Sequence, residues 1–272
     1  MMRACVIQPP YSRDLSAAEE LFDYKMKCLD ALEKPMDIVV LPEYSDVPCV
    51  TATREDTLAL HKEFIEPLLK KCEETAKRLG AIVFVNALCL VDGEYRNTTY
   101  AYNREGKLVG QYFKRHIPPL ERAIGIASDY TEQYEPPYIL ELEGIRFAFL
   151  TCYDFYFYEA FPVLARQKPD IIIGCSLQRS DSHEATEIMC RFLAYNTNAY
   201  VLRASVSFSE DSKICGASMA VAPTGEVLCN MEGRFGVSVV EIDPKEKYYK
   251  PAGFGRAPAA HHEYIEIGRA PW

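Results

Sequence analysis

The stretch IRFAFLT (145–151) leads directly into CYDFYF (152–157), so a cysteine stands at the end of an apolar run and aromatic side chains follow it. A run of this length and composition predicts a buried β-strand. Cys152 is therefore either a small core residue or a nucleophile presented where the strand ends. We expect the acid Asp154, two residues later, to fix the turn after the strand rather than to take part in chemistry.

The strand at 145–151 begins the second of two similar series of predicted elements. After it come a helix near 159–167, the strand DIIIGCS (170–176), a helix near 184–197, the strand YVLRAS (200–205) and a hairpin that turns at Thr224-Gly225. The first half of the chain shows the strand RACVIQ (3–8), a helix that starts near Ser16, the strand DIVVLPE (37–43), a helix over 55–79 with an interruption near Pro67, the strand AIVFVNA (81–87) and hairpin turns at Asp92-Gly93 and Glu105-Gly106. Each half thus predicts the order β–α–β–α–β–β–β.

This order predicts an α/β fold. Strands that alternate with helices form largely parallel sheets, and the hairpins add antiparallel strands. Two such sheets can pack face to face with the helices outside. Because no Gly/Ser-rich linker divides the chain, we expect one domain over residues 1–272. The segment 115–137 is expected to be a long loop, and the aromatic tail 244–272 to pack on the domain or on a partner subunit.

Charge and cysteine usage exclude several classes of function. The net charge of −9 argues against nucleic acid or an anionic membrane as a partner. The ten cysteines form no CxxC pair, so we expect no metal site of the zinc-ribbon kind. The chain shows no signal-peptide pattern and no apolar run of the ~20 residues that a membrane helix needs. A cytoplasmic protein with reduced thiols is the expectation.

Three predicted strands end in a polar or reactive residue: Glu43, Lys114 and Cys152. In open α/β sheets chemistry gathers beyond the carboxyl ends of strands. Each residue alone has an ordinary explanation, as a surface acid, an edge lysine or a core cysteine. Together they complement one another, because an ammonium favours a thiolate and a carboxylate can take the thiol proton and return it to a leaving amine. The lysine also offers a donor to an oxyanion.

No histidine is needed for this chemistry, and we expect His116 only to anchor the loop after Lys114. Tyr44, Tyr153 and Tyr156 are candidates to line a substrate pocket, although eighteen tyrosines make ordinary packing an equally good explanation. Ser176, at the end of the strand that follows the cysteine's strand, is a further candidate.

Five segments together resemble the nitrilase superfamily of carbon–nitrogen hydrolases, over most of the chain from residue 4 to about residue 243. In order they are DIVVLPEYSD, GQYFKRHIPP, LTCYDFYFYEAF, RFLAYNTNAYVLRAS and GASMAVAPTGEVL. The resemblance implies a four-layer αββα sandwich of two mixed sheets with outer helices. It also implies a homodimer or larger homo-oligomer, and neither metal nor cofactor.

The resemblance further implies hydrolysis through an acyl-thioester on Cys152. Glu43 would shuttle protons, and Lys114 and the backbone N–H of Tyr153 would stabilise the oxyanion. Many family members have arginine four residues after the nucleophile, where this chain has Tyr156. The family also has a second glutamate between the lysine and the cysteine. Glu121 and Glu132 are the nearest acids, and Glu121 is preferred because PPLE directly follows the lysine segment.

The sequence therefore predicts a thiol-dependent amidohydrolase that acts on a small linear amide or N-carbamoyl compound. Two alternatives stay open. The same thioester could pass its acyl or amidino group to an acceptor other than water, or the fold could serve as a binding protein without turnover.

Overall fold

The computed structural model describes residues 1–128 and 137–269, and its central elements occur in two series of the same order. The first series comprises β1 (Met2–Gln8), α1 (Ala18–Ala31), β2 (Ile38–Val40), α2 (Arg54–Leu79), β3 (Ile82–Val91), β4 (Glu94–Tyr102) and β5 (Leu108–Phe113). The second comprises β7 (Ile145–Thr151), α4 (Ala160–Arg166), β8 (Ile171–Cys175), α5 (His183–Thr197), β9 (Tyr200–Ala204), β10 (Met219–Val221) and β11 (Val227–Asn230). The predicted order β–α–β–α–β–β–β is confirmed in both halves.

The strands form two mixed sheets of six. The first has the order β12-β1-β2-β3-β4-β5, with β12 at Gly236–Ile242, and the second has the order β11-β10-β9-β8-β7-β6, with β6 at Ile139–Leu142. The neighbours β1, β2 and β3 are parallel, as are β7, β8 and β9, and the remaining pairs are antiparallel. Strand β12 pairs with β1, so the chain's last strand completes the first sheet.

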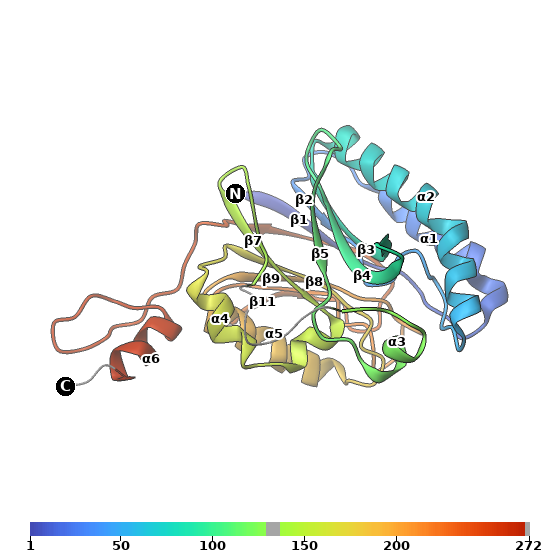
Figure 1. The fold of residues 1–272 in the computed structure, drawn as a ribbon. Helices are drawn as coiled ribbons and strands as arrows, with labels where there is room; N and C mark the ends of the chain where they lie inside the picture. Colours follow the sequence, from blue (N-terminus) through green and yellow to red (C-terminus); the bar gives the residue numbers. More distant parts are fainter. Residues whose placement is uncertain (129–136, 270–272) are drawn as a thin grey trace.

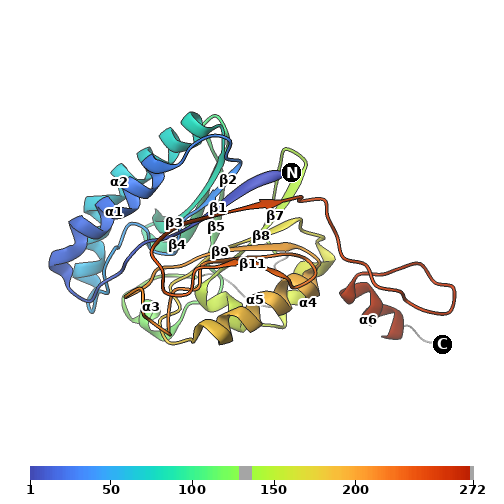
Figure 2. The same ribbon diagram turned by 180° about the vertical axis from the view of Figure 1, so that it is seen from behind.

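The two sheets are stacked between two layers of helices (Figures 1 and 2). Helices α1 and α2 cover the outer face of the first sheet, and α4 and α5 cover the outer face of the second. Alternation along the strands produces these layers, because successive side chains point to opposite faces of a sheet. On β1, Cys5 and Ile7 join the core beneath α1 and α2, whereas Ala4 and Val6 join the core between the sheets. The four-layer αββα sandwich is confirmed.

Three local features differ from the sequence-based expectation. The segment 115–137 contains the short helix α3 (Pro119–Ala123), whose first residue is a proline with φ already suited to a helix. Strand β6 was not predicted, and it forms at the sheet edge by pairing with β7. Helix α2 passes Pro67 without a break, because Phe64, Leu68 and Cys72 bind it to the sheet on both sides of the proline.

The C-terminal tail reaches its own domain through helix α6 (His261–Arg269), which contacts α4 and α5. Arg166 Nε lies 2.8 Å from Glu266 Oε1 across the α4–α6 contact. Before the helix, Lys247 Nζ donates to the backbone oxygen of Pro169 at 2.9 Å. Within the described residues, no helix has both the length and the apolar character that crossing a membrane requires.

Candidate active site

The ends of β2, β5 and β7 supply the three residues that the sequence singled out. Lys114 follows β5 directly, Cys152 follows β7 directly, and Glu43 lies three residues beyond β2. Strand β2 is parallel to β3, and two antiparallel steps through β4 return β5 to the same direction. Glu43 and Lys114 therefore leave the first sheet at the same edge.

Lys114 forms buried salt bridges with the carboxylates of Glu43 and Glu121. Its Nζ is 2.8 Å from Glu43 Oε1 and 2.5 Å from Glu121 Oε1. The side chains of Lys114 and Glu43 are 0% and 1% exposed, so this is a buried cluster of one cation and two acids. Glu121 reaches the lysine from α3. The other candidate for a second glutamate, Glu132, lies outside the described residues.

Two asparagines in the neighbouring strands hold this cluster, and sequence reasoning missed both. Asn97 on β4 donates through Nδ2 to Glu43 Oε1 at 2.8 Å and to Glu121 Oε2 at 3.3 Å. Asn86 on β3 donates to Asn97 Oδ1 at 2.7 Å and accepts from the backbone N–H of Tyr44 at 3.0 Å. For Asn86 the available signal was an amide side chain inside the apolar run AIVFVNA, because a buried polar group needs partners.

Cys152 lies in a strained turn. It is the first residue of the 3₁₀ helix η2 (Cys152–Tyr156), and its φ is +46°. A residue other than glycine rarely adopts positive φ, and holding one there costs on the order of 1–3 kcal/mol. Thr151 and Asp154 form a reciprocal capping box around the cysteine. The side chain is therefore presented by a turn that the surrounding hydrogen bonds enforce.

Asp154 ties this turn to the lysine segment. Its Oδ2 accepts from the N–H of Thr151 at 2.9 Å and from the hydroxyl of Tyr112 at 2.8 Å. Its Oδ1 accepts from the N–H of His116 at 2.9 Å. The two expectations that Asp154 fixes the turn and that His116 anchors its loop are confirmed.

One cavity of about 170 Å³ brings the reactive groups together. Glu43, Glu121 and Cys152 all line it, and so does Tyr44. Lys114 lies behind this wall, fully buried, and reaches both acids. Most of the remaining described lining is apolar, with Val47, Leu120 and Leu177 as examples. The cavity thus offers a small compartment with one thiol and two carboxylates.

Burial and charge set the protonation states of the cluster. Burial by itself lowers the pKa of Lys114, but Glu43 and Glu121 outweigh it and the pKa is raised. Burial, joined by Glu43 but opposed by Lys114, raises the pKa of the Glu121 carboxyl to about 7. Burial also raises the pKa of the Cys152 thiol well above its ordinary value; Glu43 adds to this, and Lys114 only partly opposes it.

Lys114 acts on the sulfur in the expected direction, since it favours the thiolate, but burial and the charge of Glu43 outweigh it. Lys114 is at the same time bound by two acids, Glu43 and Glu121.

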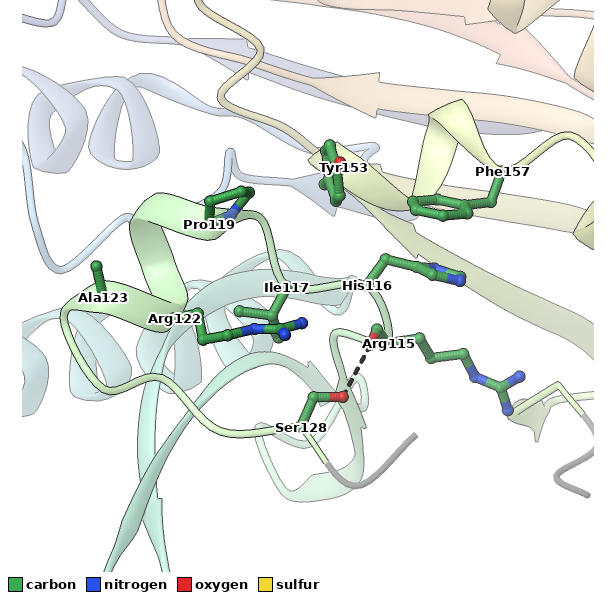
Figure 3. A pocket seen from close by; sticks show the side chains of 9 residues that line it. All are labelled: Arg115, His116, Ile117, Pro119, Arg122, Ala123, Ser128, Tyr153 and Phe157. Atoms are coloured by element: carbon green, nitrogen blue, oxygen red, sulfur yellow. Dashed lines mark hydrogen bonds between the residues drawn. The ribbon is translucent and has the colours of Figure 1, made fainter. Parts of the chain in front are cut away.

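The other predicted binding residues do not belong to the described lining of this cavity. Tyr153 lines a second pocket, of about 690 Å³, together with His116, Phe157 and Arg122 (Figure 3). In this pocket the rings of His116 and Phe157 stack at 3.6 Å. Tyr156 is exposed and its hydroxyl donates to Asp181.

Ser176 is completely buried beyond the end of β8. Helix α3 separates the two cavities, since Leu120 and Glu121 line the first and Arg122 and Ala123 the second. In the described ranges 1–128 and 137–269, no group of three or more His, Cys, Asp or Glu side chains is arranged to hold a metal ion.

Comparison with known proteins identifies the family to which this sequence belongs. The sequence profile described as carbon–nitrogen hydrolase matches residues 3–248. A curated relative, 2-oxoglutaramate amidase of Bacillus subtilis (strain 168), is 24% identical over 219 residues, covering 78% of this chain and 80% of the relative. A hydrolase in the pqqF 5′ region of Pseudomonas protegens is 26% identical over 229 residues, with 82% and 76% covered.

Solved structures show the same fold. An amidase of Nesterenkonia sp. AN1 from the nitrilase superfamily superimposes with a TM-score of 0.72 at 16% identity, over 98% of this chain and 96% of that one. Another structure of that amidase, with acrylamide added at its active-site cysteine, gives a TM-score of 0.71 at 18% identity and covers 89% and 94%. The profile match spans most of the sequence, and the chain therefore belongs to the carbon–nitrogen hydrolase family.

Proposed function

We propose that the protein is a thiol-dependent amidohydrolase that cleaves the C–N bond of a small amide or N-carbamoyl compound through an acyl-thioester on Cys152. One observation carries the proposal: Cys152, Glu43 and Glu121 line the same small cavity while Lys114 binds both acids. Acyl transfer through a thioester uses a nucleophile, a base and a cation that lie close together.

In the first half-reaction, Glu43 takes the proton from Sγ as the sulfur attacks the carbonyl carbon of the amide. The electron pair of the C=O bond moves to the oxygen. Lys114 has three N–H donors and gives two to carboxylates, so the third is assigned to this oxyanion, with the N–H of Tyr153 as a second donor. When the C–N bond breaks, Glu43 returns the proton to the leaving amine and the thioester remains.

In the second half-reaction, water loses a proton to Glu43 and adds to the thioester carbon. The C–S bond breaks, the carboxylic acid leaves, and the sulfur regains a proton. Glu121 is assigned to accept a hydrogen bond from the amide N–H₂ of the substrate, because it shares the cavity wall with Cys152. Two relatives support an amide substrate, since their names describe them as amidases.

We expect the purified protein to release ammonia from short primary amides or N-carbamoyl compounds. The cavity of about 170 Å³ is smaller than the roughly 300–1,000 Å³ of pockets for drug-sized ligands, so short substrates should be favoured. Ammonia release from amides of increasing chain length measures this. Intact-protein mass spectrometry of rapidly quenched reactions should show one acyl group on Cys152.

Three results would contradict the proposal. They are the absence of ammonia release from every amide and carbamoyl compound tested, an acyl group on a different cysteine, and release that survives alkylation of Cys152. Transfer of the acyl group to an added amine in preference to water would instead favour the transferase alternative.

A pH profile tests the second carboxylate. Lys114 Nζ and Asn97 Nδ2 both donate to Glu121, so they hold its ionised, acceptor-only form in place. We expect kcat/KM to rise as pH increases through about 7, where the Glu121 carboxyl ionises. Glu43 and Cys152 line the same cavity as Glu121, but we attribute the inflection to Glu121. The variant Glu121→Gln should lose the inflection and most of its activity, roughly 10²-fold or more.

Stability provides an independent readout of the same pKa. The folded pKa of Glu121, about 7, lies above the value of ~4.3 for an unfolded chain, so the folded state binds more protons between these values. Stability should therefore fall as pH rises from about 4 to about 7, and Glu121→Gln should remove this part of the slope. An unchanged inflection and slope in that variant would assign the titration to another group.

A further inference from the structure

Tyr44 directly follows Glu43 in the chain and has two unusual features. Its hydroxyl is buried and, within residues 1–128 and 137–269, has no hydrogen-bond partner. Its φ is +52°, a left-handed conformation that is an outlier for a bulky side chain. Buried polar groups rarely lack a partner, and backbone strain of this kind is concentrated at functional sites. Both features therefore direct attention to what the hydroxyl binds during the reaction.

Neighbouring residues hold Tyr44 in this conformation. Its N–H donates to Asn86 Oδ1 at 3.0 Å, and its carbonyl oxygen accepts from the N–H of Val47 at 2.9 Å. The residue is 8% exposed and lines the cavity that contains Cys152. Tyr44 is thus fixed in the cavity wall, with a hydroxyl that no described residue binds.

The other three hydroxyls in the described lining of this cavity already have partners. Those of Tyr11 and Thr57 donate to backbone oxygens at 2.7 and 2.8 Å. The hydroxyl of Thr51 pairs with that of Thr57 at 2.7 Å. Tyr44 is therefore the one hydroxyl of the described lining that is available to a bound molecule.

The charges that act on this phenol place it at the glutamate end of the cavity. Burial raises the pKa of Tyr44 well above its ordinary value, and among charged groups Glu121 and Glu43 contribute most to the rise. Burial also raises the pKa of Tyr11, but the largest charge effect there comes from Arg179, which lowers it. Tyr44 thus keeps its proton close to the two acids, where it can donate a hydrogen bond.

We propose that Tyr44 is a further catalytic residue, whose hydroxyl donates a hydrogen bond to the oxygen of the water molecule that cleaves the thioester. The inference rests on the proposed function and assigns a role in its second half-reaction. It also states what directs the acyl group to water rather than to another acceptor.

The attacking water needs a donor that the rest of the cluster does not supply. Glu43 takes one hydrogen of the water, and Glu121 can accept the other. Asn97 uses both Nδ2 hydrogens on these two carboxylates. Lys114 uses two of its three there as well, and the third is assigned to the oxyanion. A hydrogen bond from Tyr44 holds the water oxygen and leaves its other lone pair free to attack.

Tyr44 orients the water in this step and exchanges no proton. The water oxygen bonds to the thioester carbon while one water proton passes to Glu43, and the C=O electron pair moves to the oxygen. When that pair returns, the C–S bond breaks and the sulfur takes the proton from Glu43. Holding a reactant in place in this way speeds a reaction without any new chemical group.

The fate of the acyl-enzyme tests this role. Propionamide is incubated with the protein and hydroxylamine, and the two products, propionate and propionohydroxamate, are quantified by liquid chromatography. Hydroxylamine attacks the same thioester through its nitrogen, loses a proton from that nitrogen to the sulfur, and depends less on being held because it is a stronger nucleophile than water. The ratio of hydroxamate to acid is therefore independent of the folded fraction, of substrate binding and of the rate of acylation.

Tyr44→Phe should raise the hydroxamate-to-acid ratio by about 10-fold, the effect of one lost hydrogen bond on water attack. A tyrosine that only bound the substrate or the oxyanion would leave the ratio unchanged, because both products form from the same thioester through the same oxyanion. The variant should also be at least as stable as the wild type in urea unfolding, since it removes a buried hydroxyl that lacks a partner.

Tyr11→Phe is the matched control, because it removes a buried hydroxyl from the same cavity wall, but one that donates to the backbone. It should keep the wild-type ratio and lose stability. An unchanged ratio in Tyr44→Phe, or an equal rise in Tyr11→Phe, would overturn this inference and leave the proposed function in place. If the wild-type protein forms neither product from propionamide or from any other amide tested, the proposed function fails as well.

Discussion

Replacing Cys152 with alanine should reduce amide hydrolysis by about 10⁴-fold or more and should abolish the acyl-enzyme in mass spectra. The reason is that no other cysteine can take over: Cys152 is the only thiol in the described lining of the cavity that also contains Glu43 and Glu121. The protein should still fold, because the substitution removes only the sulfur atom and introduces no steric clash. Steady-state ammonia release and circular dichroism measure the two effects.

Two further variants separate chemistry from folding. Cys190→Ala removes a buried thiol from the core under α4 and α5, and it should cost stability while keeping activity. Cys152→Gly should be as inactive as Cys152→Ala but more stable than it by about 1 kcal/mol, because glycine relieves the positive φ of +46°. Amide hydrolysis by Cys152→Ala would contradict the thioester mechanism. Equal stability of Cys152→Ala and Cys152→Gly would contradict the backbone strain at residue 152.

Replacing Lys114 with methionine should both inactivate and destabilise the protein. The variant leaves Glu43 and Glu121 buried beside each other without a cation, and breaking a buried pair in this way costs about 3–5 kcal/mol. Hydrolysis should fall by roughly 10³-fold, because the oxyanion loses its charged donor. Urea unfolding at several pH values measures the cost, which should shrink as pH falls, because the Glu121 carboxyl takes up a proton.

The double variant Lys114→Met/Glu121→Gln should recover part of the stability and none of the activity, since it removes one of the two orphaned acids.

Lys25→Met is the matched control. Lys25 is also a buried lysine, but within residues 1–128 and 137–269 its Nζ donates only to the backbone oxygen of Ser45, and burial lowers its pKa to about 8. Its loss should cost about 1–3 kcal/mol, the penalty for an unsatisfied backbone group. A larger loss in Lys25→Met than in Lys114→Met would contradict the account of the cluster.

In the mechanism proposed above, a carboxylate takes the proton of the thiol. Lys114 is bound by two acids, and the pKa of Cys152 is raised well above its ordinary value. A raised thiol pKa is consistent with a thiolate that forms as the sulfur attacks.

Local sequence patterns were enough to predict the two series of elements and the strand ends that carry Glu43, Lys114 and Cys152. Strand and helix periodicities act over a few residues. The runs before Lys114 and Cys152 end directly at those residues, whereas β2 ends earlier than expected, three residues before Glu43. The preference for Glu121 over Glu132 also came from the sequence, through its closeness to the lysine segment. The structure places Glu121 on Lys114, while Glu132 lies outside the described residues.

Other features depended on contacts between distant parts of the chain. Strand β12 completes the first sheet because β1 has a free edge, which no local pattern reveals. Asn86 and Asn97 hold the glutamates only because β3 and β4 are neighbours. The sequence by itself determined which residues end the strands, since that depends on neighbours in the chain. Only the tertiary structure decided that Arg179 shares a cavity with Cys152 while Tyr153 faces a second pocket, because side-chain surroundings arise when separate elements pack.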